Sequence, residues 1–124
     1  MAIRVLIADD HRLFAEALEA ILAADRRIEV VAHAGDGREA VDLAAELEPD
    51  VVLMDISMPV MDGIEAAAEL RAGGAHDPRI LMLTGSNSRD DVDRARKAGA
   101  AGYVTKDRIA AELIDAIVEI AERP

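Results

Sequence analysis

The sequence contains no cysteine and no tryptophan, and one phenylalanine and one tyrosine are its only aromatic residues. Without cysteine the chain can form neither a disulfide framework nor a zinc–thiolate site. Its apolar runs are far shorter than the ~20 residues of a membrane-spanning helix. The first run starts at Ile3, which leaves no room for a signal peptide. We therefore expect a soluble, cytoplasmic protein that does not contact membranes and has an aliphatic core.

Positive charge is also scarce, since 14 Lys and Arg face 25 Asp and Glu, for a net charge of −11. Contact with DNA, RNA or anionic lipid needs clustered Lys and Arg, so we expect no direct nucleic-acid contact from this chain. There are only two lysines, Lys97 and Lys106. Hydrophobic residues make up 52% of the 124 positions, which predicts one domain over residues 1–124 with a core of ordinary size.

Five short apolar runs predict five β-strands, at Ile3–Ala8, Ile28–Ala34, Val51–Met54, Ile80–Thr84 and Gly102–Thr105. Helical spacing follows each run. Asp36, Asp62 and Ser88 are expected helix caps, because Glu39, Glu65 and Asp91 follow them at the spacing of a capping box. The first helix is expected to bury a stripe formed by Leu13, Phe14, Ala17, Leu18, Ile21 and Leu22. The fourth helix has few apolar positions and is expected to be weakly anchored.

The run Val51–Met54 is apolar at every position, which is typical of a strand covered on both faces in a parallel sheet. Strands that alternate with helices imply right-handed βαβ units. The sequence therefore predicts the α/β class, as a doubly wound (βα)5 flavodoxin-like domain whose five-stranded parallel sheet has the order 2-1-3-4-5.

Polar residues collect where the predicted strands end. Asp9 and Asp10 follow the first strand, Asp55 follows the third, Thr84 ends the fourth, and Lys106 follows the fifth. Ligands of such sheets bind beyond the carboxyl ends of the strands. With the order 2-1-3-4-5, these four ends surround one crevice.

Three carboxylates in one crevice repel one another, so the arrangement predicts a bound cation. Oxygen ligands without His or Cys favour Mg²⁺, with Mn²⁺ as the other option. Three aspartates, one Mg²⁺ and Lys106 sum to zero charge, which suits phosphoryl transfer. Asp55 ends the central strand and should be held most firmly, so it is the predicted nucleophile. Asp9 and Asp10 are the predicted metal holders.

Four motifs occur in order: Asp9-Asp10, DISMPVMDG at residues 55–63, Leu83-Thr84-Gly85, and GAAGYVTKD at residues 99–107. With them, the chain resembles the receiver domains of bacterial two-component response regulators over nearly its whole length. The segments ADDHRLF and GYVTKD most resemble the NarL/FixJ subfamily, whose receivers precede a LuxR-type helix-turn-helix. The resemblance implies a signalling phosphoacceptor rather than an enzyme, with a sensor histidine kinase as phosphodonor and a homodimer as an expected form after phosphorylation.

The resemblance also implies a role for each matching residue. Asp55 would be phosphorylated, and Asp10, Asp55 and the backbone carbonyl of Ser57 would bind Mg²⁺ directly, with Asp9 acting through water. Thr84 would hydrogen-bond the phosphoryl group, Lys106 would pair with it, and Tyr103 would be the switch aromatic. Many receivers have a cis proline after this lysine. Asp107 stands there in this chain, which leaves the geometry of that peptide bond open.

Simpler interpretations exist for the same residues. Asp10 could cap the first helix, Thr84 could be an ordinary strand residue, Lys106 a solvated lysine, and Tyr103 part of the core. The histidines His11, His33 and His76 lack the spacing of metal ligands and are interpreted as surface or packing residues, with only His11 near the crevice.

Other functions are also compatible with the fold class. A haloacid-dehalogenase-type phosphohydrolase uses an aspartyl nucleophile but needs a second aspartate two residues later, where this chain has Ser57. A flavodoxin-like cofactor module would need a phosphate-binding loop in place of three carboxylates. Among receivers, the chain could regulate transcription through a DNA-binding domain outside these residues, or act alone through protein contacts.

Overall fold

The parallel sheet forms as the sequence predicts. A computed structural model of the chain describes residues 2–73, 77–85 and 89–123. Its strands are β1 (Ile3–Ala8), β2 (Ile28–Ala34), β3 (Val51–Asp55), β4 (Arg79–Thr84) and β5 (Gly102–Thr105). All neighbouring pairs are parallel, and the strand order is β2-β1-β3-β4-β5. The predicted order is confirmed, and β3 is the central strand.

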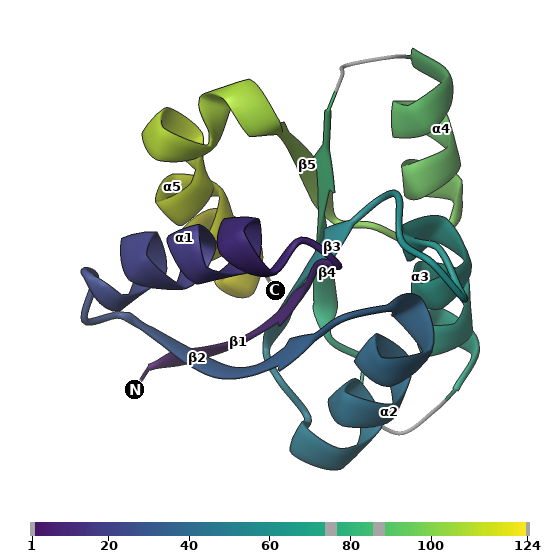
Figure 1. The fold of residues 1–124 in the computed structure, drawn as a ribbon, viewed down its shortest axis with the longest axis horizontal. Coiled ribbons are helices and arrows are strands. Elements are labelled where there is room, and N and C mark those ends of the chain that lie inside the picture. Colours follow the sequence, from purple (N-terminus) through teal and green to yellow (C-terminus); the bar gives the residue numbers. More distant parts are fainter. Residues whose placement is uncertain (1, 74–76, 86–88, 124) are drawn as a thin grey trace.

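Helices cover both faces of the sheet. They are α1 (Arg12–Ala23), α2 (Gly37–Leu47), α3 (Gly63–Ala72), α4 (Arg89–Lys97) and α5 (Ile109–Ala121), with a short 3-10 turn, η1, at Lys106–Arg108. Figure 1 shows α1 and α5 side by side on one face, and α2, α3 and α4 on the other. This arrangement confirms the predicted doubly wound α/β class. Among the described helices, none has the length and apolarity to cross a membrane.

The core has two aliphatic layers that share the sheet. Along β3, Val51 and Leu53 pack with the α1–α5 side, while Val52 and Met54 pack with the α2–α3 side. Every residue of β3 is buried. Burying each large aliphatic side chain stabilises the fold by about 1.5–3 kcal/mol. The end of β3 is therefore a firm support for the aspartate that follows its apolar run.

Helix starts follow the predicted capping signals where the structure describes them. The Asp36 carboxylate accepts a hydrogen bond from the Glu39 amide at 2.8 Å. Asp62 and Glu65 form the complete capping box of α3. The third predicted cap, Ser88, lies outside the described residues. These caps supply partners for amides that would otherwise have none at a helix start.

The predicted stripe of α1 is wrong in part. Leu13 is 82% exposed and Ala17 is exposed, whereas the buried residues are Ala15, Leu18 and Leu22. At 100° per residue, Leu13 lies about 140° around the helix from Leu18, outside the stripe that can face a sheet. The predicted anchoring of α4 is confirmed as weak, because Ala95 is the one buried residue of that helix.

Candidate functional site

The strand ends bring the predicted polar residues to one edge of the sheet. The register pairs Ala8 with Met54, so Asp9 follows β1 at the level where Asp55 ends β3. Asp55 in turn pairs with Leu83, the residue before Thr84. Asp9, Asp55 and Thr84 are 4%, 3% and 2% exposed and are the buried polar residues of the described chain. The sheet thus gathers its buried polar side chains at neighbouring strand ends.

Asp55 has a defined partner for each carboxylate oxygen. Its Oδ1 accepts a hydrogen bond from the Ser57 amide at 3.2 Å, and its Oδ2 lies 3.3 Å from Lys106 Nζ. The lysine comes from η1, immediately after β5. Lys106, predicted to pair with the phosphoryl group, is therefore already in contact with Asp55. All peptide bonds of the described residues are trans, including the bond from Lys106 to Asp107.

Three aspartates and one histidine form a compact cluster. Asp9, Asp10, His11 and Asp55 each offer one ligand atom, and these atoms lie within 4.8 Å of one another. We call these four residues the acidic cluster. Asp9 Oδ1 accepts a hydrogen bond from the His11 amide at 2.8 Å, whereas its buried Oδ2 has no hydrogen-bond partner among the described residues. Asp10 does not cap α1, because the N-cap residue of this helix is His11 and no side chain accepts a hydrogen bond from its first amides.

The surroundings of Asp9 disfavour its charge. Burial raises the pKa of the Asp9 carboxyl above its ordinary value of 3.8, and the nearby charge of Asp55 acts in the same direction. The His11 amide and the charge of Lys106 oppose this shift only in part. A buried carboxylate oxygen without a partner is costly, and a divalent cation would supply the missing interaction. The oxygen ligands of the acidic cluster therefore fit a hard cation such as Mg²⁺.

Tyr103 is not part of the core, so that interpretation is wrong. The residue is 43% exposed on β5, opposite Met82 of β4. It borders a groove of about 240 Å³ that also includes Val92 and Ala95 of α4. Gly85, just beyond Thr84, has open space where a Cβ would stand. Tyr103 thus lies at the β5–α4 surface and outside the acidic cluster.

The sequence did not assign Phe14 to the site, and it placed His11 near the crevice without giving it a contact there. Phe14, predicted only as part of a core stripe, places its ring 4.7 Å from Lys106 Nζ, a cation–π distance. His11, interpreted as a surface or packing residue, directs Nδ1 toward the carboxylates of Asp9 and Asp10. The rarity of aromatic residues was the only signal for Phe14, and the position next to Asp10 the only signal for His11.

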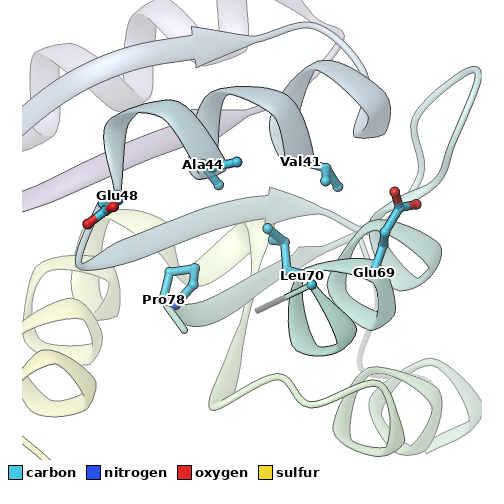
Figure 2. A pocket seen from close by; sticks show the side chains of 8 residues that line it. Val41, Ala44, Glu48, Glu69, Leu70 and Pro78 are labelled. Atoms are coloured by element: carbon cyan, nitrogen blue, oxygen red, sulfur yellow. The ribbon is translucent and has the colours of Figure 1, made fainter. Parts of the chain in front are cut away.

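Two hollows of the surface include residues of α2. One of about 350 Å³ lies beside Asp9, Asp10 and His33, and opens the acidic cluster to solvent. Figure 2 shows another, of about 290 Å³, between α2 and α3, where Val41, Ala44 and Leu70 line an apolar surface. None of the residues lining this second groove belongs to the acidic cluster, so the site chemistry concerns the first hollow.

The sequence of the chain is similar to those of known regulatory proteins. The chain is 47% identical over 115 residues to the transcriptional regulatory protein LiaR of Bacillus subtilis, covering 93% of this chain and 54% of LiaR. It is 39% identical over 122 residues to the chemotaxis protein CheY of Halobacterium salinarum, covering 97% and 98%. The chain spans about half the length of LiaR and of several other curated relatives that it matches.

Solved structures share the fold. The signal receiver domain of NarL from Mycobacterium tuberculosis superposes with a TM-score of 0.93 at 34% identity, covering 99% of this chain and 98% of that domain. The relatives LiaR and NarL agree with the predicted NarL/FixJ subfamily. Residues 5–118 match the response regulator receiver domain family, and the chain belongs to that family.

Proposed function

We propose that residues 1–124 form a cytoplasmic receiver domain in which Asp55 takes a phosphoryl group from the phosphohistidine of a sensor histidine kinase. The proposal rests on the burial and the contacts of Asp55. It is buried at the end of the central strand, lies 3.3 Å from Lys106 Nζ, and shares the acidic cluster with Asp9, whose Oδ2 has no partner among the described residues. The proposed nucleophile Asp55, the positive charge of Lys106 and the proposed cation ligands thus lie together at one end of the sheet.

In the transfer, a carboxylate oxygen of Asp55 attacks phosphorus, and a P–O bond forms as the P–N bond of the phosphohistidine breaks. The histidine ring leaves and takes a proton from solvent. Lys106 balances negative charge on the transferring oxygens, and the hydroxyl of Thr84 donates to the transferred group. Such reactions depend mainly on positioning and charge stabilisation, and Asp55, Thr84 and Lys106 at the ends of β3, β4 and β5 contribute to both.

The same site would hold Mg²⁺, with Mn²⁺ as a substitute. Asp10, Asp55 and the Ser57 carbonyl are the proposed direct ligands, and Asp9 the ligand that acts through water. When bound, the ion supplies positive charge to the phosphoryl oxygens. The chain catalyses only its own phosphorylation and slow dephosphorylation, so it acts as a signalling phosphoacceptor.

Phosphorylation changes the conformation of α4 and β5, which form the output surface of the domain. Thr84 moves toward the phosphoryl group, and Tyr103 occupies the space that Thr84 vacates. The one buried residue of α4 is Ala95, so little packing energy opposes its displacement. LiaR is named a transcriptional regulatory protein, which supports transcription as the output, with a homodimer of this domain as the active form. The match to nearly all of CheY supports the alternative of a receiver that acts alone, and the reading frame beyond Pro124 distinguishes the two.

Labelling with acetyl phosphate and Mg²⁺ tests the phosphoacceptor directly. We expect one hydroxylamine-sensitive phosphoryl group on Asp55, none after chelation of Mg²⁺, and none on Asp55→Asn. Asp93→Asn is the matched control, because Asp93 is an exposed aspartate of α4, and this variant should be labelled like the wild type. Undiminished labelling of Asp55→Asn, or labelling that ignores chelation, contradicts the proposal.

Phe14 is expected to be a positioning residue for Lys106. Phe14→Leu removes the ring below Nζ, an interaction of about 0.5–1 kcal/mol, so acyl-phosphate formation should slow about two- to fivefold. Phe14→Tyr keeps a ring and should restore the rate. Urea unfolding of both variants separates this effect from lost packing. Equal rates for the Leu and Tyr variants would show that the ring does not act on Lys106.

A further inference from the structure

The imidazole of His11 faces the carboxylates of the site. Its Nδ1 lies 3.2 Å from Asp10 Oδ1 and 3.4 Å from Asp9 Oδ1. The ring belongs to the same group of four residues whose ligand atoms lie within 4.8 Å of one another. The His11 side chain is 68% exposed, so it can adjust without disturbing the core. The receiver function proposed above gives this nitrogen no role.

The separations around Nδ1 match those of ligands that share one metal ion. Two ligand atoms that each lie about 2.1 Å from an ion are roughly 3.0 Å apart at a right angle and 3.4 Å apart in a tetrahedron. The distances from Nδ1 to the two carboxylates fall at or between these values. Nδ1 of His11 therefore lies at a ligand-to-ligand separation from one oxygen of each of two carboxylates.

A second observation points to a ligand at this place. The Asp9 side chain has 0% exposure, and its Oδ2 has no hydrogen-bond partner among the described residues. Asp9 therefore has a carboxylate oxygen to offer in a cluster that also holds the imidazole of His11, and together they are a mixed set of oxygen and nitrogen donors. Imidazole suits Zn²⁺, Co²⁺ and Ni²⁺, whereas Mg²⁺ prefers oxygen alone.

We propose that His11 is a nitrogen ligand through which the acidic cluster binds divalent transition metals, with Zn²⁺ as the representative ion, in competition with Mg²⁺. The inference rests on the proposed function, because Asp9, Asp10 and Asp55 serve both ions. His11 then determines metal selectivity: it contributes to the binding of a transition metal and not to that of Mg²⁺. A plain ion pair of His11 with Asp9 and Asp10 predicts no such difference between metals.

Calorimetric titration with Zn²⁺ alone and with Mg²⁺ alone separates these possibilities. We expect His11→Gln to lower Zn²⁺ affinity by at least about tenfold and to leave Mg²⁺ affinity within about twofold. His33→Gln is the matched control, because His33 Nε2 pairs with Glu19 at 2.9 Å on the same side of the molecule and is not in the acidic cluster. Nitrogen NMR of ¹⁵N-histidine-labelled protein should show Zn²⁺ shifting Nδ1 of His11.

The titrations decide whether His11 is a ligand of the transition metal. Unchanged Zn²⁺ affinity in His11→Gln, a loss in His33→Gln instead, or an equal loss of Zn²⁺ and Mg²⁺ affinity overturns the role of His11. If such a result accompanies normal Mg²⁺-dependent labelling of Asp55, the inference fails and the receiver function stands. If the wild type binds neither ion and accepts no phosphoryl group, the proposed function itself fails.

Discussion

Asp9→Asn is expected to make the metal-free protein more stable and to weaken its binding of Mg²⁺. Asp9 is buried with one oxygen unpartnered among the described residues, and Asp55 adds a second negative charge nearby. An amide removes the charge, keeps the oxygen that accepts from the His11 amide, and places a donor where Oδ2 stands. Removal of a buried charge that Asp55 repels should raise the free energy of unfolding by about 1–3 kcal/mol.

The gain should depend on pH with a definite sign. Burial raises the pKa of Asp9 in the folded state above its ordinary value of 3.8, so the folded protein binds this proton more tightly than the unfolded chain. The destabilisation from Asp9 is therefore absent below about 3.8, grows as pH rises toward the folded-state pKa, and is complete above it. Asp9→Asn should exceed the wild type in stability at neutral pH and lose this advantage under acidic conditions.

Urea unfolding with and without Mg²⁺ measures both effects. Asp10→Asn is the control within the same cluster, because the Asp10 side chain is 31% exposed and its charge is solvated. Asp10→Asn should change the free energy of unfolding of the metal-free protein much less than Asp9→Asn does. Mg²⁺ should stabilise the wild type more than Asp9→Asn. An Asp9→Asn protein that is no more stable than the wild type at neutral pH would show that the Asp9 charge is already compensated.

Strand positions and their ends were predictable because two simple rules apply to them. A run such as Val51–Met54, apolar throughout, is typical of a strand covered on both faces, and β3 is buried along its whole length. Parallel register then places the residues after each strand at one edge, which is why Asp9, Asp55 and Thr84 were expected together. Both rules concern the backbone and need no knowledge of side-chain direction.

Side-chain direction explains what the sequence did not reveal. Leu13 and Phe14 are adjacent apolar residues of α1, yet Leu13 is exposed and Phe14 lies beside Lys106, since one residue step rotates a helix by about 100°. The orientation of His11 follows from the turn in which Asp9 accepts its amide. The exposure of Tyr103 depends on how closely α4 covers β5. Such details depend on contacts between distant segments, which a periodic pattern does not encode.

Gly63→Ala is expected to destabilise the protein and to distort the site at the same time. Gly63 is the first residue of α3, and its amide donates to the Ile56 carbonyl at 3.0 Å. A Cβ at this position would overlap the backbone carbonyl oxygen of Asp55 and come within 2.9 Å of Ile56 Cα. Because both contacts are backbone atoms, no side chain can rotate away, and α3 must move from the end of β3.

Overlap of this kind should cost about 3 kcal/mol in the free energy of unfolding, at the upper end for overpacking. Movement of the backbone around Asp55 should also slow labelling by acetyl phosphate about 100-fold, since displacements near 1 Å have that effect on positioned groups. Gly35→Ala is the matched control, because its Cβ would meet nothing within 4 Å, and it should change stability by less than about 0.5 kcal/mol. If Gly63→Ala matches Gly35→Ala in both urea unfolding and labelling rate, then the start of α3 does not hold Asp55 in place, and the geometry of the site depends on β3 alone.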